Sequence, residues 1–340
     1  MEEQSKYIDI ISEIDSNYKI MQGMRPIPES AIRAYYEDFC YATAHSSTAI
    51  EGNTFSYDET ILLLKRGVTL SNHTLKEHNE LLGYSKGYWF LYQALKDNTS
   101  TANASDNKTS TANTLNNKTS IASNKDFITT DLINQIHKRV MFDEDYAGLY
   151  RNVDVVIGNS VTDKVDYEPP SFDKVPKLVQ KYVRDVNAQL RDIVPCFRQV
   201  ADLKVEPSAN KLASNKNTQS SDENEISKSE VVDWYKIFHT LAEHHIKFER
   251  IHPYQDGNGR TGRLLLNFEL MSLGLLPVDI RYQEKARYYS GLKNFDTKSK
   301  YSTDPNSKTD SMAKLVAESQ LRSMEWWNKM FRGYLGNSKF

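Results

Sequence analysis

The sequence predicts a mainly α fold, a single-domain helical bundle with one small β-hairpin. Apolar residues recur at helical spacing through most of the chain, which indicates many amphipathic helices. β-Branched residues lie around a predicted turn at Gly158-Asn159 in one stretch, Val153–Val161, which predicts a single hairpin. The 340 residues suffice for one large domain, although only 39% of them are hydrophobic. We therefore expect parts of the chain to lie outside the core.

Composition divides the chain into segments. Residues 1–28 are expected to form an N-terminal extension, and residues 29–96 a group of helices. The segment 97–125 repeats Asn-Lys-Thr-Ser and lacks the apolar residues needed for packing, so it is expected to be a low-complexity insertion. The rest is predicted to comprise a core at 126–331, polar insertions within it at 203–229 and 297–311, and a tail at 332–340.

Each helix is predicted from its apolar face and its end signals. The first, within residues 1–24, has an apolar face made of Tyr7, Ile8, Ile11 and Ile14. The second begins at Glu29 and ends before Gly52-Asn53. The later helices are predicted at Ser56–Arg66 before Gly67, at His73–Lys96, from a capping Thr130 to Met141, and at Phe172–Ile193, Val231–Arg250, Leu264–Leu273 before Pro277, Glu284–Phe295 and Met312–Phe331.

Charge and cysteine usage narrow the function classes. The net charge is −2, so no basic field indicates a nucleic-acid partner. No apolar run is long enough to span a bilayer, and the first residues lack the apolar core of a secretory signal. Cys40 and Cys196 lack metal-site spacing and are expected to be buried thiols in a reducing compartment. We expect a cytoplasmic protein without nucleic-acid or membrane partners.

The clearest chemistry lies in one loop between two predicted helices, with the sequence HPYQDGNGRTGR. Gly257, Asn258 and Gly259 open the second helix, where backbone N–H groups converge on one point and favour a phosphate. Arg260 and Arg263 are three residues apart and share a face of the first turn. Because two cations there oppose the helix dipole, they indicate a polyphosphate ligand.

Two further side chains in the loop complete this chemistry. Asp256 offers a hard oxygen ligand beside the phosphates, which suits Mg²⁺. His252 can take a proton near neutral pH. Base, metal ligand, anion site and arginines together indicate nucleotide phosphoryl chemistry. The structural alternative is a glycine-rich turn whose arginines are only solvated.

The loop resembles the signature of the Fic (filamentation induced by cAMP) family, HPFx(D/E)GNGRxxR, with Tyr254 in place of the usual Phe. The resemblance implies a Fic-type helical bundle that transfers AMP from ATP, with Mg²⁺, to a Ser, Thr or Tyr hydroxyl of a target protein or of this protein itself. It implies His252 as the general base and Asp256 as the metal ligand. A homodimer is a further expectation. The implied ATP-phosphate site is Gly257, Asn258, Gly259, Arg260, Thr261, Gly262 and Arg263.

An acidic residue ends the helix that begins at Glu29. Glu51 faces the negative end of the helix dipole, where a cation is preferred, and this indicates a distant partner. Ser47, Glu51 and Gly52 resemble the inhibitory motif of Fic proteins, (S/T)xxxE(G/N). The resemblance implies that Glu51 pairs with Arg263 and blocks seating of the γ-phosphate. It places the chain in the class with an N-terminal inhibitory helix.

Two more sites follow from the resemblance. The sequence GLYR precedes the predicted hairpin, as in the Fic flap, which pins a target segment over the base by strand-like pairing. Tyr288 and Tyr289 resemble the position that contacts the adenine or ribose. The residues implied to lie near ATP and target are Ile157, Gly158, Asn159, Ser160 and Val161.

Other activities stay open at this stage. The same groups could instead remove AMP from a modified protein, with the inhibitory glutamate orienting a water molecule. A few Fic enzymes also use other phosphate-containing donors in place of ATP. A binding module that only senses ATP would not need His252. A metal-dependent phosphohydrolase would use some of His239, His244, His245, His252 and Asp256 as ligands. The adjacent His244 and His245 would then point about 100° apart on a helix, which is poor geometry for one metal.

Overall fold

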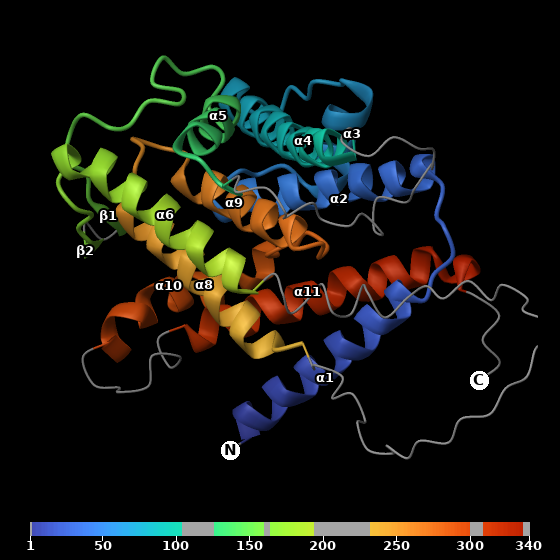
Figure 1. The fold of residues 1–340 in the computed structure, drawn as a ribbon. Coiled ribbons are helices and arrows are strands. Elements are labelled where there is room, and N and C mark those ends of the chain that lie inside the picture. Colours follow the sequence, from blue (N-terminus) through green and yellow to red (C-terminus); the bar gives the residue numbers. More distant parts are fainter. Residues whose placement is uncertain (1, 104–125, 160–163, 194–231, 300–308, 336–340) are drawn as a thin grey trace, which may run out of the picture.

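Ten α-helices and a two-stranded hairpin make up the described part of the computed structural model, residues 2–103, 126–159, 164–193, 232–299 and 309–335 (Figure 1). The mainly α prediction is confirmed. The helices are α1 (Glu2–Gln22), α2 (Glu29–Ile50), α3 (Tyr57–Arg66), α4 (Leu75–Asn103), α5 (Thr130–Val140), α6 (Val175–Ile193), α8 (Trp234–Ile251), α9 (Asn258–Ser272), α10 (Lys285–Ser299) and α11 (Asp310–Met330). Short 3₁₀ turns lie at Phe172–Lys174, Tyr282–Glu284 and Arg332–Tyr334.

Helix α9 lies at the centre of the bundle. Helices α2, α4, α5 and α8 all pack against it (Figure 1). Apolar residues occur on several sides of α9, as a helix surrounded by others requires. Those that are buried are Leu264, Leu265, Leu266, Phe268 and Leu270. The N-terminal turn of α9, which begins at Asn258, is therefore enclosed by residues from several helices.

Helix α1 packs along α11, and α11 packs against α8 (Figure 1). The predicted apolar face of α1 is correct for Tyr7 and Ile14, which are buried, and Ile11 packs against the core. It is wrong at Ile8, which is 66% exposed. Residues spaced by four and three share a helix face, whereas Ile8 lies about 100° around from Tyr7.

Two predicted helix ends are shifted. Helix α5 is capped by Thr129 rather than Thr130, since the Thr129 hydroxyl accepts a backbone N–H of the first turn. Helix α9 ends at Ser272, earlier than Pro277. Gly274 adopts a φ of 78°, and this left-handed residue ends the helix before the proline is reached.

Two helices extend into segments that were predicted to be polar insertions. Helix α4 continues to Asn103 and α10 continues to Ser299, past the predicted boundaries at 97 and 297. No glycine or proline stands in either extension to stop the helix. Most of the insertions at 97–125 and 297–311, and all of 203–229, lie outside the described residues, as does Cys196. The division into segments therefore stays a prediction, whereas Cys40 is a buried free thiol.

The hairpin pairs β1 (Ile157–Asn159) with β2 (Lys164–Tyr167) in antiparallel register. Gly158 and Asn159 were predicted to form its turn, and this was wrong, because both residues lie within β1. Asn159 pairs with Lys164, so the connection between the strands follows Asn159. Ser160 and Val161 lie outside the described residues.

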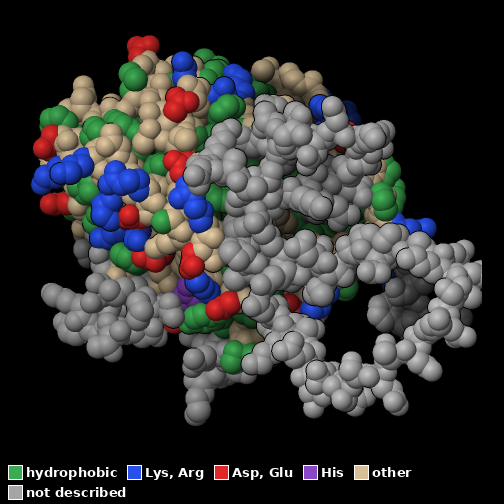
Figure 2. Space-filling model, in the orientation of Figure 1, with side chains coloured by type: hydrophobic (Ala, Val, Ile, Leu, Met, Phe, Trp, Pro, Cys, Tyr) green, Lys and Arg blue, Asp and Glu red, His purple; other side chains and the backbone are tan. Residues whose placement is uncertain are grey.

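Basic and acidic side chains lie beside one another on the coloured part of the face in Figure 2. This mixture agrees with the net charge of −2. Within the described ranges, none of the helices combines the length and hydropathy needed to cross a bilayer.

Candidate active site

The predicted loop between α8 and α9 is closed by Asn258. Its Oδ1 accepts the N–H of Tyr254 at 2.9 Å, and its Nδ2 donates to the Tyr254 carbonyl, also at 2.9 Å. His252 follows α8 with a φ of 47°, and Gly257 caps α9 with a φ of 75°. The N–H groups of a helix's first turn have no partner within the helix, so this turn offers donors to an anion.

The imidazole of His252 is held in its neutral form. Its Nδ1 lies 3.3 Å from the carbonyl of Glu249. A carbonyl only accepts, so Nδ1 carries the proton and Nε2 keeps a free electron pair. Burial lowers the pKa of His252 to about 4, and the ring is therefore uncharged near neutral pH.

Asp256 fits the requirements of a magnesium ligand. Its side chain is 47% exposed, so an ion can reach a hard carboxylate oxygen beside the anion-binding turn. Its Oδ1 accepts the N–H of Gly257 at 2.5 Å and a donor of Arg260 at 3.3 Å. These contacts orient the carboxylate toward the start of α9.

Arg260 is buried between two acidic groups. Its Nη2 lies 3.3 Å from Asp256 Oδ1, and its Nη1 lies 3.7 Å from Glu80 Oε1. Its Nε is buried and has no partner among the described residues. A buried guanidinium with an unused donor is suited to an anionic ligand.

Comparisons with known proteins agree with this site. The model of the Fic/DOC family matches residues 198–270. Protein adenylyltransferase fic-1 of Caenorhabditis elegans is 26% identical over 265 residues, which cover 77% of this chain and 38% of that protein. Protein adenylyltransferase Fic of Nematostella vectensis is 27% identical over 283 residues, covering 82% and 47%. The segment 198–270 therefore matches the Fic/DOC family, and most of the chain is similar to Fic proteins.

Solved Fic structures share the fold. A Fic domain containing signaling protein from Bacteroides thetaiotaomicron superposes with a TM-score of 0.65 at 18% identity, covering 96% of this chain and all of that one. Fic-1 from C. elegans gives a TM-score of 0.57 at 20% identity, covering 96% of this chain and 72% of that one. The chain spans less than half the length of the two curated relatives above.

The last arginine of the Fic signature, Arg263, has a partner for each of its nitrogens. Nη2 donates to Glu51 Oε1 at 2.6 Å and to the Ser47 carbonyl at 3.0 Å. Nε donates to Ser47 Oγ at 2.8 Å, and Nη1 donates to the Tyr288 hydroxyl at 3.3 Å. The pairing of Glu51 with Arg263 that the Fic resemblance implied is present in the structure.

Gly259 and Gly262 of the Fic signature leave room for two carboxyl groups. A Cβ at Gly259 would lie 2.3 Å from Glu51 Oε1, and one at Gly262 would lie 2.1 Å from Glu249 Oε1. Burial raises the pKa of Glu249 to about 8, so this carboxyl is protonated near neutral pH. Its Oε1 is buried and has no partner among the described residues.

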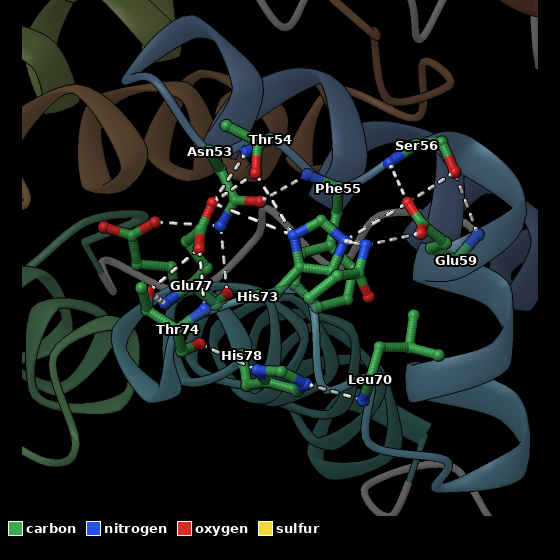
Figure 3. A network of polar contacts seen from close by, with 12 residues as sticks. Asn53, Thr54, Phe55, Ser56, Glu59, Leu70, His73, Thr74, Glu77 and His78 are labelled. Carbon is green, nitrogen blue, oxygen red and sulfur yellow. Dashed lines mark hydrogen bonds and ion pairs between the residues drawn. The ribbon is translucent and has the colours of Figure 1, made fainter.

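The segment that follows Glu51 is tied down by a polar network (Figure 3). His73 stacks on Phe55, with ring centroids 3.7 Å apart. Its ring nitrogens lie 3.3 Å from Glu59 and 4.0 Å from Glu77 (Figure 3). Glu59 belongs to the first turn of α3 and Glu77 to the first turn of α4, so His73 joins the starts of two helices.

Each of these glutamates also caps its own helix. Glu59 forms a capping box with Ser56 at the start of α3. Glu77 accepts the N–H of Thr74 at 2.8 Å and the hydroxyl of Thr54 at 2.5 Å. Hydrogen bonds, chiefly from Ser56 to Glu59 and from Thr54 to Glu77, lower the pKa of both carboxyls to about 2. Both glutamates are thus charged near neutral pH.

Asn53 connects this network to the Fic signature. Its Nδ2 donates to the Glu77 carbonyl and to Glu80 Oε2, each at 2.9 Å. The other oxygen of Glu80 lies 3.7 Å from Arg260. The segment after Glu51 therefore reaches a second signature arginine through Glu80.

The histidines considered as metal ligands have other partners. His244 Nδ1 lies 2.7 Å from Glu269, and His245 Nε2 lies 2.9 Å from the Tyr288 hydroxyl. His239 Nδ1 lies 2.6 Å from the Thr309 hydroxyl. In the part of the chain that the structure describes, no three His, Cys, Asp or Glu side chains are grouped to hold a metal. The structure does not bring the histidines together as the phosphohydrolase hypothesis required.

Arg151 has a role at the site that the sequence analysis missed. Its Nε donates to the carbonyl of His252 at 2.8 Å, and its own N–H donates to the carbonyl of Pro253 at 3.0 Å. Its guanidinium also donates to the carbonyls of Val153 and Pro170, on either side of the hairpin. The GLYR sequence pointed to a flap, but nothing in it showed that this arginine also holds the backbone of His252.

The remaining predicted residues are placed as follows. Tyr288 is buried against Arg263, whereas Tyr289 is 42% exposed. Thr261 is buried, and its hydroxyl has no partner within the described ranges. Strand β2 is tied to the end of α8, because the Tyr167 hydroxyl donates to the Arg250 carbonyl at 3.2 Å. The hairpin therefore stands beside the loop that carries the base.

Proposed function

We propose that this chain is a protein adenylyltransferase, which transfers AMP from ATP to a Ser, Thr or Tyr hydroxyl of a target protein or of the chain itself. The observation that carries the proposal is a partly buried, neutral His252 in the loop that leads into a helix N-terminus with two buried arginines. Similarity to protein adenylyltransferases over 77% of the chain supports it. Because those relatives are much longer, the activity and target are proposals for this chain.

In the proposed reaction, the target hydroxyl oxygen attacks the α-phosphorus of ATP. A bond forms between that oxygen and the phosphorus, the α–β anhydride bond breaks, and pyrophosphate leaves with the bonding electrons. Nε2 of His252 takes the hydroxyl proton, since Nδ1 already donates to Glu249. Arg260, Arg263 and the first N–H groups of α9 hold and neutralise the phosphates.

Asp256 would hold the magnesium ion that accompanies ATP. When bound, that ion supplies further neutralisation of phosphate charge. The N–H of Gly257 and the guanidinium of Arg260 keep the carboxylate facing the phosphate site. Asp256 is thus oriented before any ligand arrives.

Glu51 is proposed to inhibit AMP transfer. It occupies Nη2 of Arg263, the group proposed to grip the γ-phosphate. Two negative groups cannot share that donor without repulsion. The γ-phosphate therefore has to displace Glu51, or ATP binds in a pose that does not react.

The proposal also covers the hairpin, Tyr289, the location of the protein and its oligomeric state. The hairpin is proposed to hold the target segment, because β2 is tied to the helix that ends at His252. Tyr289 is proposed to contact the base or ribose, since it is the exposed member of its pair. A cytoplasmic location is proposed from the free thiol of Cys40, and a homodimer from family resemblance alone.

Removal of AMP from a modified protein is the second candidate function. One observation favours it: burial lowers the pKa of His252, and the charge of Glu51 opposes that shift, so this carboxylate lies close enough to act on His252. A carboxylate beside the base can orient a water molecule for attack on an AMP ester. Both directions use the same site.

The test of the proposed function compares wild type, Glu51→Gly and the double variant Glu51→Gly/His252→Ala with α-labelled ATP and magnesium. We expect strong covalent labelling of Glu51→Gly, weaker labelling of wild type and none of His252→Ala in a Glu51→Gly background. Equal labelling of all three proteins would contradict both assignments. If AMP-modified protein instead loses its label with wild type and not with Glu51→Gly, removal of AMP is the main activity.

A further inference from the structure

His137, from helix α5, lies against the inner side of the signature loop. Its side chain is completely buried, at 0% exposure. Its ring stacks on Tyr254, with centroids 3.6 Å apart and planes within 4° of parallel. Tyr254 is itself fixed, because its hydroxyl donates to Asn134 at 2.8 Å. The loop therefore rests on α5 through a flat aromatic contact.

Two hydrogen bonds set the tautomer of His137. The N–H of Gly148 donates to Nδ1 at 2.8 Å, so Nδ1 is an acceptor and carries no proton. Nε2 must then carry the proton of the neutral ring, and it donates to the carbonyl of Asp256 at 2.9 Å. Burial also lowers the pKa of His137 to about 4, in agreement with a neutral ring.

The next residue of the loop is pressed against the same helix. A Cβ at Gly257 would lie 2.7 Å from Met141 Sδ and 3.3 Å from His137 Nε2. The φ of Gly257 is 75°, which also favours glycine. The peptide between Asp256 and Gly257 is thus fixed from one side by His137, and the Gly257 N–H on that peptide donates to the Asp256 carboxylate.

We propose that His137 is a positioning residue for the divalent cation of the reaction. It holds the Asp256–Gly257 peptide, and this peptide in turn directs the Asp256 carboxylate toward the phosphates. His137 itself touches neither ion nor ATP. The inference rests on the proposed function only in assigning the cation to Asp256, and partners of this kind commonly change metal affinity or activity by about 10- to 100-fold.

The test measures ATP binding by calorimetry, with magnesium and with EDTA, in a Glu51→Gly background. The quantity of interest is the factor by which magnesium tightens ATP binding. His137→Phe keeps the stacking contact and loses both hydrogen bonds, and we expect this factor to fall by roughly 10-fold. His137→Gln places an amide donor near the Nε2 position, and we expect it to retain most of the factor.

His78 provides a matched control. It is also a buried histidine with one bond to a backbone N–H, from Leu70 at 3.1 Å, and one to a carbonyl, of Thr74 at 2.7 Å (Figure 3). His78→Phe therefore removes the same two kinds of bond away from the signature loop. We expect it to lower the melting temperature as much as His137→Phe while the magnesium factor stays unchanged.

Equal magnesium factors in His137→Phe and His78→Phe would overturn the proposal. If His137→Phe does not fold, His137→Gln is compared with His137→Asn, whose shorter amide reaches only the Nδ1 position. Equal factors in that pair would overturn the proposal as well. If magnesium coupling follows the expected pattern but no AMP transfer is found, the proposed function fails and the role of His137 stands.

Discussion

Burial shifts the pKa of two single residues at this site away from their ordinary values. It lowers the pKa of His252 to about 4 and raises that of Glu249 to about 8. Both shifts favour the uncharged form, as expected for groups taken out of water. Near neutral pH the end of α8 therefore presents a neutral base and a neutral acid, next to the ion pair of Arg263 with Glu51.

Glu249→Gln should stabilise the protein increasingly as the pH rises. In the unfolded chain Glu249 ionises near its ordinary value of 4.5, and in the folded chain near 8. The unfolded state therefore loses its proton first, and wild type loses stability between these two values. Glutamine does not ionise. The unfolding free energy of the variant should therefore exceed that of wild type by a margin that grows over this window by on the order of a few kcal/mol.

Urea unfolding at several pH values checks this difference. The matched control is Glu243→Gln, on the same helix, where the carboxylate is 36% exposed and pairs with Lys247. We expect the control to show almost no dependence of its stability difference on pH. A stability difference for Glu249→Gln that is constant with pH would show that this carboxyl is ionised in the folded protein.

At the scale of elements, the connector between α2 and α4 determines where Glu51 lies. Glu51 is only the C-cap of α2, and its backbone continues into a segment fixed by Asn53, Thr54 and the starts of α3 and α4. The contact of Glu51 with Arg263 is thus supported from both sides, by α2 before it and by the network of Figure 3 after it. Loosening the connector should weaken the hold of Glu51 on Arg263.

The single variant Asn53→Ala should be labelled several-fold more strongly than wild type. The variant removes the hydrogen bonds to the Glu77 carbonyl and to Glu80, which hold the backbone two positions after Glu51 in place. A lost hydrogen bond worth about 1 kcal/mol changes the equilibrium between the bound and released positions of Glu51 roughly fivefold. In the Glu51→Gly background the same substitution should leave the rate nearly unchanged, because there is no inhibitory contact left to weaken. Equal increases in both backgrounds would mean that Asn53 acts on the signature itself.

The elements were predictable from sequence where their signals are local. The start of α3 follows from Ser56 and Glu59, and the GNGR turn follows from its own glycines. The bonds that build the site join residues far apart in the chain, such as His137 and Asp256, at a separation of 119 positions. No periodicity reports such a contact. The pairing of Glu51 with Arg263, 212 positions apart, was reached only through family resemblance.

At the scale of the whole molecule, the site is assembled on α9 from the surrounding helices. Helix α2 supplies Ser47, α4 supplies Glu80, α5 supplies His137 and α8 leads into His252. A ligand that contacts several of these elements links them and should stabilise the fold as a unit. The nucleotide is expected to be such a ligand.

Magnesium and ATP together should raise the melting temperature of Glu51→Gly more than that of wild type. In wild type, Glu51 already holds Arg263, and the nucleotide must displace it or bind without that contact. Stabilisation by a ligand grows with its concentration relative to the dissociation constant, so the weaker complex shifts less. A thermal shift series over ATP concentration checks this. Identical shifts in the two proteins would mean that Glu51 does not compete with the nucleotide.

The left-handed backbone of His252, with a φ of 47°, has a consequence for how this fold can evolve. A non-glycine residue in that region costs on the order of 1–3 kcal/mol, which glycine avoids. His252→Gly should therefore be more stable than His252→Ala, by about 1 kcal/mol in urea unfolding, and equally inactive. A descendant of this chain released from selection for activity would gain stability by drifting to glycine here. Keeping a histidine in this conformation is a stability–activity trade-off within a single residue.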